Sequence, residues 1–165
     1  MKLIPQPLQL QLQDGSYCVR YQDRITLDAA CGEAACGYGR LLAQELEEQT
    51  GFALSLDRRS GYCHPGFHLS VNGEVKARLG SESYELRISQ DGVEIAGGDD
   101  AGLLYGVQTL RQIIRLSGPL LPCLYAADAP ALPARGLFYD VTDGNYQGEQ
   151  RIDFLGSEGD QYDVR

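Results

Sequence analysis

Few side chains in this sequence are spaced as catalytic groups or metal ligands usually are, and the two histidines are the first to consider. His64 and His68 are four positions apart, the spacing at which two side chains on one helix face can bind the same metal ion. Pro65-Gly66 lies between them and breaks a helix. We therefore expect no metal site at these histidines.

The cysteines are the second group with possible chemistry. An odd number of cysteines without repeated spacing is a poor disulfide framework, and unpaired cysteines usually behave as small buried apolar residues. A metal site that uses Cys31 and Cys36, or Cys63 beside His64, is the less favoured alternative. This cysteine usage suits a reducing cytoplasm, and residues 1–15 do not read as a signal peptide, so we expect a cytoplasmic protein. The five cysteines are Cys18, Cys31, Cys36, Cys63 and Cys123.

Asp99 and Asp100 are the third candidate, because paired carboxylates can serve as acid and base. They follow a strand pattern and precede a helical one, which is where an aspartate caps a helix. We expect a cap rather than a catalytic pair. The neighbouring Gly97-Gly98 lacks the lysine and the extended glycine pattern of a phosphate loop. The sequence therefore predicts no cofactor and no catalytic residue in this chain.

The stretch from residue 80 to 114 organises the predicted fold. Apolar and polar residues alternate over 84–89 and again over 93–95, which predicts two strands, and Asp91-Gly92 between them is a hairpin turn signal. From residue 101 the apolar residues recur at helical spacing until 114. Gly118-Pro119 ends this predicted helix.

Shorter segments complete the expected fold. A first helix is predicted over 38–49, with residues 29–37 as a loop before it and 57–65 as a loop after the next strand. Asp14-Gly15 and Asn72-Gly73 are expected turns, and 75–79 fits no single pattern. Strands that outnumber two one-faced helices indicate an α+β fold: a mostly antiparallel or mixed sheet with two helices packed on one face. The further strands are expected at 8–12, 17–21, 25–27, 52–56, 67–71, within 120–128 and at 136–141.

Length and charge exclude several classes of function. The 165 residues suit one domain with a single core. A net charge of −9 leaves no excess of lysine and arginine to neutralise phosphates, which argues against nucleic acid and anionic membranes as partners. No apolar run is long enough to span a membrane.

The organising stretch also resembles a known family. The start Ile4-Pro5-Gln6-Pro7 and the order of residues that follows are similar to the N-terminal non-catalytic domain of family 20 glycoside hydrolases, the β-N-acetylhexosaminidases. That resemblance implies the same α+β layout as the periodicity does. The matching positions are Gly80, Glu82, Tyr84, Leu86, Ile88, Gly92, Val93, Ile95, Ala101, Gly102, Tyr105, Gly106, Gln108, Thr109, Leu110 and Gln112.

A second part of the chain resembles the junction into that family's catalytic barrel. The pattern is Asp128-Ala129-Pro130, then Arg135-Gly136 and Asp140. In family members this arginine contacts sugar hydroxyls, so the resemblance makes Arg135 the candidate substrate-binding residue. A structural ion pair between Arg135 and Asp140 is the alternative. We expect a domain over 1–141, with the start of a missing barrel from about 135, and a divergent acidic tail over 142–165.

The resemblance also implies what this chain lacks. A (β/α)8 barrel needs about 250 residues, and the family's substrate-assisted hydrolysis uses an adjacent Asp-Glu pair in that barrel. No Asp-Glu dipeptide occurs here. We therefore expect the chain alone to be inactive. Its partner would be the barrel of a parent enzyme, and the exposed barrel-facing patch could mediate self-association.

Two other functions remain open from the sequence. The chain could be a free-standing carbohydrate-binding or interaction module, in which case exposed aromatic side chains should mark the binding surface. It could also be the related accessory domain of another exo-glycosidase, such as an α-glucuronidase. The tyrosines to inspect for sugar binding are Tyr62, Tyr125, Tyr146 and Tyr162.

Overall fold

A computed structural model describes residues 1–59, 65–132 and 136, and every described helix and strand lies in the compact unit Met1–Pro130. The remaining residues, Ala131–Arg165, form a second unit. The strands are β1 Gln9–Cys18, β2 Arg24–Asp28, β3 Ser55–Arg59, β4 Phe67–Val71, β5 Tyr84–Ile88, β6 Val93–Gly97 and β7 Leu120–Asp128. The helices are α1 Ala34–Thr50, α2 Gly73–Leu79 and α3 Asp100–Ser117.

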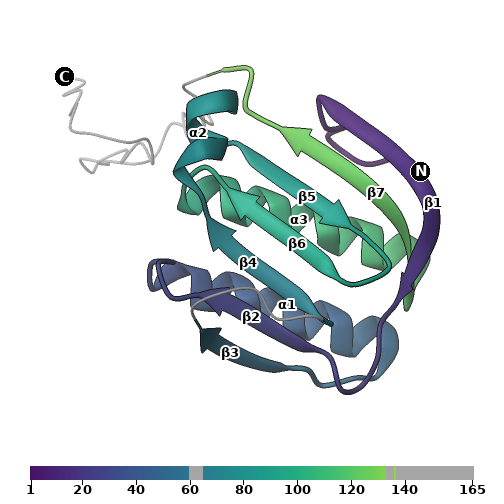
Figure 1. Ribbon diagram of the computed structural model, residues 1–165. Coiled ribbons are helices and arrows are strands. Elements are labelled where there is room, and N and C mark those ends of the chain that lie inside the picture. Colours follow the sequence, from purple (N-terminus) through teal and green to yellow (C-terminus); the bar gives the residue numbers. More distant parts are fainter. Residues whose placement is uncertain (60–64, 133–135, 137–165) are drawn as a thin grey trace, which may run out of the picture. The chain divides into compact units, whose positions relative to one another are not determined.

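The strands of this unit form one mixed sheet of seven strands in the order β1-β7-β5-β6-β4-β2-β3 (Figure 1). Strands β3, β2, β4 and β6 are mutually parallel where they pair, whereas β5, β6, β7 and β1 pair antiparallel. The hairpin predicted at Asp91-Gly92 joins β5 to β6, with Ile88 opposite Val93. Strands β1 and β3 are the two edges of the sheet.

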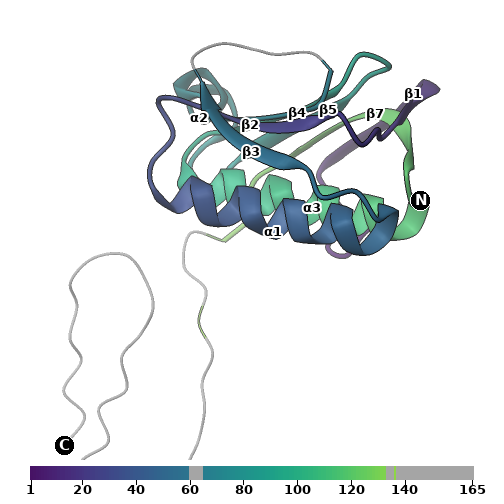
Figure 2. The ribbon, with the colours of Figure 1, turned by 90° about the horizontal axis from the view of Figure 1, so that it is seen from below.

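Helices α1 and α3 lie side by side on one face of the sheet (Figure 2). This confirms the predicted α+β fold with two helices packed on one face. The short helix α2 was not predicted, and it lies apart from that layer. Its first residues follow Asn72, whose side-chain oxygen accepts the backbone N–H of Glu74 at 2.8 Å. The Asn72-Gly73 pair is therefore a helix cap instead of the expected turn.

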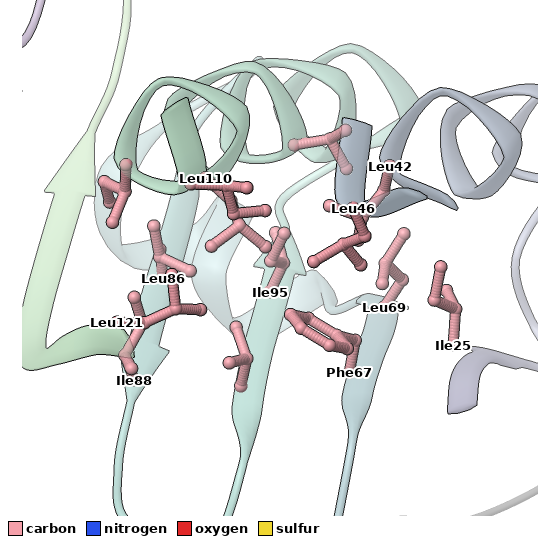
Figure 3. Packing of buried hydrophobic residues seen from close by; sticks show 14 of the residues in the cluster. Ile25, Leu42, Leu46, Phe67, Leu69, Leu86, Ile88, Ile95, Leu110 and Leu121 are labelled. Atoms are coloured by element: carbon pink, nitrogen blue, oxygen red, sulfur yellow. The ribbon is translucent and has the colours of Figure 1, made fainter. Parts of the chain in front are cut away.

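The core lies between this helix pair and the sheet. Leu86, Ile95 and Leu69 project from three neighbouring strands toward Leu110 of α3 and Leu46 of α1 (Figure 3), and all five are at most 1% exposed. The alternation of apolar residues in the strands and their helical spacing in α1 and α3 therefore both mark side chains of this buried layer. Burial of such a side chain contributes about 1.5–3 kcal/mol.

A buried carboxylate joins the two helices. Glu45 of α1 has no exposed side-chain surface. It accepts hydrogen bonds from Arg115 Nε at 2.7 Å and Arg111 Nε at 3.1 Å, both from α3. These contacts hold the pKa of Glu45 below its ordinary value, mainly through the Arg115 hydrogen bond. The pair of arginines thus satisfies a charge that burial would otherwise disfavour.

Two glycines let α3 approach the sheet. A Cβ at Gly102 would lie 1.9 Å from the backbone oxygen of Ser83, and one at Gly106 would lie 2.5 Å from Ile95 Cγ2. Neither position has room for a larger residue without movement of the neighbours. The family-like Ala-Gly-Leu and Tyr-Gly patterns therefore have a packing reason in this chain.

Three sequence expectations are corrected by the described residues. Asp14-Gly15 is not a turn, because it lies inside β1, where the register with β7 shifts between Leu12 and Ser16; such an irregularity keeps one strand continuous. Helix α1 begins at Ala34, within the segment expected to be a loop. Strand β3 begins at Ser55 and continues to Arg59, since its backbone pairs with β2 beyond the apolar alternation.

The N-terminal segment is fastened to α3 and β7. The Gln112 side chain accepts the backbone N–H of Ile4 and donates to the Ile4 carbonyl, both at 2.9 Å. The backbone N–H of Leu8 donates to Asp128 Oδ1 at 3.2 Å. These hydrogen bonds tie Ile4 to the C-terminal half of α3 and Leu8 to the last residue of β7.

Candidate functional site

The candidate sugar contact, Arg135, lies outside the described residues, as does its alternative partner Asp140. Most of the strand expected over 136–141 also lies there, and so does the acidic tail. The described chain leads toward this segment through β7, which ends at Asp128. The described side chains with possible chemistry therefore belong to the unit Met1–Pro130.

Asp99 caps α3, as the sequence predicts. Its Oδ1 accepts the backbone N–H of Gly102 at 3.0 Å, and its Oδ2 accepts that of Glu82 at 2.9 Å. Lys76 Nζ lies 3.8 Å from Oδ2. Glu82 has φ 58°, a left-handed conformation that the Asp99 contact holds in place. Both carboxylate oxygens of Asp99 thus serve the fold, which leaves no reason to assign it acid–base chemistry.

The histidines and cysteines form no metal site in the part of the chain that is described. No group of three or more potential ligands gathers there. His64 and Cys63 lie outside the described residues, and His68 is a mostly buried residue of β4. Burial raises the pKa of both Cys31 and Cys123, so both thiols are protonated near neutral pH. Cys31 and Cys123 are buried, as expected, whereas Cys18 is exposed and Cys36 is only partly buried.

One of the four tyrosines singled out for sugar binding is described, and it is engaged in the sheet. The Tyr125 hydroxyl donates to Glu85, and Arg87 lies over its ring at 5.9 Å from the centroid. Glu85 also pairs with Arg78 Nη2 at 2.8 Å. Tyr125 is therefore part of a packed polar cluster on the sheet face opposite α1 and α3. Tyr62, Tyr146 and Tyr162 lie outside the described residues.

Two features of the described residues escaped the sequence analysis. Tyr21 is 76% exposed, although its place in an expected strand suggested packing. Asp23 is buried: its Oδ2 accepts from the Tyr17 hydroxyl at 2.7 Å and from the Arg20 backbone N–H at 2.9 Å, and its Oδ1 has no hydrogen-bond partner. Only the polar character of residues 20–24 hinted at a turn here. The Tyr17–Asp23 bond fastens the connection between β1 and β2.

Taken together, the charged side chains described here support the fold. Glu45 links two helices, Asp99 caps one, Glu85 fixes a tyrosine, and Asp57 pairs with Arg24 at 2.8 Å. In addition, no described helix is long and apolar enough to cross a membrane.

Comparison with known proteins gives a consistent result. The family model described as glycosyl hydrolase family 20, domain 2, matches residues 1–129. A β-hexosaminidase of Vibrio vulnificus is 28% identical over 155 residues, which cover 93% of this chain and 16% of that protein. A β-N-acetylhexosaminidase of Cellulomonas fimi is 29% identical over 143 residues, with 84% of this chain and 28% of that protein covered.

A solved structure shows the same fold. The family 20 β-N-acetylhexosaminidase of Streptomyces coelicolor superposes with a TM-score of 0.63 at 28% identity, over 76% of this chain and 26% of that one. The chain thus spans between 16% and 28% of the length of these relatives.

Proposed function

The chain belongs to glycosyl hydrolase family 20, as its domain 2, and from that membership we propose that it is the accessory domain of a longer β-N-acetylhexosaminidase. In that role it packs against the catalytic barrel and stabilises it. The barrel supplies the acid–base chemistry, and this chain alone hydrolyses no substrate. The parent removes terminal N-acetylhexosamine from its substrates.

One observation carries this proposal. The family match, residues 1–129, coincides with the compact unit Met1–Pro130 that contains every described helix and strand. The matched domain is therefore folded as a whole unit in this chain. The relatives named above are hexosaminidases, which favours that parent over an α-glucuronidase.

The surface around α3 is suited to contact with another domain. Leu116, in the last turn of α3, is 60% exposed, and Ile4, which Gln112 holds against α3, is 74% exposed. A second domain that covered these two side chains would remove their apolar surface from water, which is favourable. We assign this surface to contact with the catalytic barrel.

We further propose that Arg135 contacts the substrate in the parent enzyme. The match to the Vibrio vulnificus protein covers 93% of this chain, and position 135 is too far from either end to fall outside it. A guanidinium offers a fixed fork of donors to neighbouring hydroxyls. Arg135 would then be this chain's contribution to an active site that the barrel completes.

Kinetics of the full parent enzyme test the proposed substrate contact of Arg135. We expect Arg135→Ala to lower kcat/KM about a hundredfold, which corresponds to two lost hydrogen bonds to a charged group. Arg135→Lys should recover little of this loss, because an ammonium cannot reproduce the fork. Arg20→Ala, an exposed arginine in the same domain, is the control and should leave kcat/KM unchanged. Full activity of Arg135→Ala would contradict the substrate contact and leave a structural pair with Asp140.

A further inference from the structure

Among the described residues, no strand pairs with the outer edge of β1, and Asp14 is the only charged residue of this strand. In the described part of the chain β7 is the strand that pairs with β1, which ends the sheet. The opposite edge, β3, carries Asp57, Arg58 and Arg59, and charges of this kind discourage pairing with another chain. Residues 8–13 of β1 and its approach read Leu-Gln-Leu-Gln-Leu-Gln and carry no charge.

Leu8 and Leu12 lie beyond the cover of the helices, whereas Leu10 is partly buried against the core. Leu10 and Leu12 stand opposite Ala126 and Leu124 of β7, so they share the face on which α1 and α3 pack. Leu124 and Ala126 are fully buried, whereas Leu12 is 60% exposed. Leu8, two residues before Leu10, is 73% exposed. The strand thus presents leucines on one face and exposed glutamines on the other.

We propose that β1 pairs antiparallel with β1 of a second copy of this chain, about a two-fold axis through Gln11. Such an axis stands perpendicular to the sheet, so even-numbered residues meet even-numbered ones. Leu10 then lies opposite Leu12 of the other copy, and Gln9 lies opposite Gln13. Within residues 9–13 leucine lies opposite leucine and glutamine lies opposite glutamine, and cross-strand pairs of this kind stabilise a sheet.

A second copy fits this edge better than a strand of unrelated sequence. The Leu-Gln repeat of β1 can pair with itself so that like residues lie opposite each other. The axis at Gln11 also keeps every paired residue inside β1. The irregularity after Leu12 bends the strand away from a longer pairing. A two-fold contact leaves two charged β3 edges on the outside, so the assembly stops at a dimer. This interface uses residues 9–13 rather than Ile4 and Leu116, and it does not depend on the proposed function.

Sedimentation velocity of the 165-residue chain over a range of concentrations tests the proposal. We expect a reversible monomer–dimer equilibrium. Gln11→Lys places two like charges opposite each other at the axis and should weaken dimerisation at least about tenfold. The control is Tyr21→Lys, which adds the same charge at a side chain that is 76% exposed and outside β1, and it should leave the equilibrium unchanged.

A second variant, on the other face of β1, distinguishes a dimer that forms through the β1 edge from one that forms through other contacts. Leu12→Lys removes an exposed leucine and should weaken the dimer by a similar factor, with an unchanged thermal transition because the side chain is 60% exposed. A chain that is monomeric at every concentration would overturn the proposal. So would a dimer that resists both β1 variants, or one that Tyr21→Lys weakens equally.

Discussion

Gly102→Ala should lower the free energy of unfolding by at least about 3 kcal/mol, a large fraction of the stability of a typical domain. The new Cβ would lie 1.9 Å from the Ser83 backbone oxygen and 2.8 Å from the Ser83 carbonyl carbon. These are backbone atoms at the start of β5, which cannot turn aside as a flexible side chain could. Either α3 or the β5 segment must move, and the core between them would lose contacts.

Gly37→Ala is the matched control for this substitution. Gly37 lies in α1, is exposed, and has no atom within 4 Å of the site where a Cβ would stand. Alanine favours a helix over glycine by about 0.5–1 kcal/mol, so this variant should be slightly more stable than the natural chain. Urea unfolding monitored by circular dichroism measures both variants. Equal stability of the two would show that α3 does not approach β5 as closely as described.

Glu45→Gln should cost about 2 kcal/mol of unfolding free energy at neutral pH. The amide keeps the size of the side chain but removes the charge that Arg111 and Arg115 contact, and it presents a donor to their N–H groups. The expected cost is at the low end for a broken buried pair because the Arg115 side chain is 54% exposed. Glu47→Gln, an exposed glutamate on the same helix, should change stability by less than about 0.5 kcal/mol.

The effect of Glu45→Gln should depend on pH in a defined direction. The arginines depress the pKa of Glu45 below its ordinary 4.5 in the folded chain. Its contribution is therefore complete above 4.5 and is lost as the pH falls through the lower folded pKa. The difference in stability between the natural chain and the variant should be constant from pH 7 to about 5 and shrink in more acidic solution. A difference that persists undiminished into strong acid would mean that the charge of Glu45 contributes nothing.

The sequence predicted those parts of the fold that follow from local burial. The helical spacing of Leu103, Val107 and Leu110 and the alternation over 84–89 both record which side chains face the core. These patterns gave the α+β class, both long helices, the hairpin and the cap at Asp99. The family resemblance agreed with them because the same residues pack the helix layer.

Other features depend on long-range placement, which a local pattern does not contain. The alternation at Leu8, Leu10 and Leu12 predicts a strand correctly, yet its burial depends on whether a helix covers that edge. Asp14-Gly15 has the composition of a turn, but pairing with β7 on both sides keeps β1 continuous. Strand order and the parallel pairing of β2, β3, β4 and β6 likewise arise from contacts between distant segments.

The candidate site likewise has features that the sequence predicted and features that it did not. The sequence assigned a helix cap to Asp99 or Asp100 and buried positions to the cysteines. The described contacts place the cap at Asp99, and they bury Cys31 and Cys123 but not Cys18. The pairing of Glu45 with two arginines of α3 joins residues 66 and 70 positions apart, so no local spacing could reveal it. The substrate contact of Arg135 rests on the resemblance and remains a prediction.

Reading the source locus for about a kilobase beyond the codon for Val141, in all three frames, tests the central proposal most directly, since a barrel occupies about 250 residues. The account predicts a barrel-coding sequence that contains an adjacent Asp-Glu pair, in the same frame or a shifted one. Arg135 would then stand at the border of an active site that this sequence completes. A locus that encodes no barrel would contradict the accessory role, and the folded domain would need a function of its own.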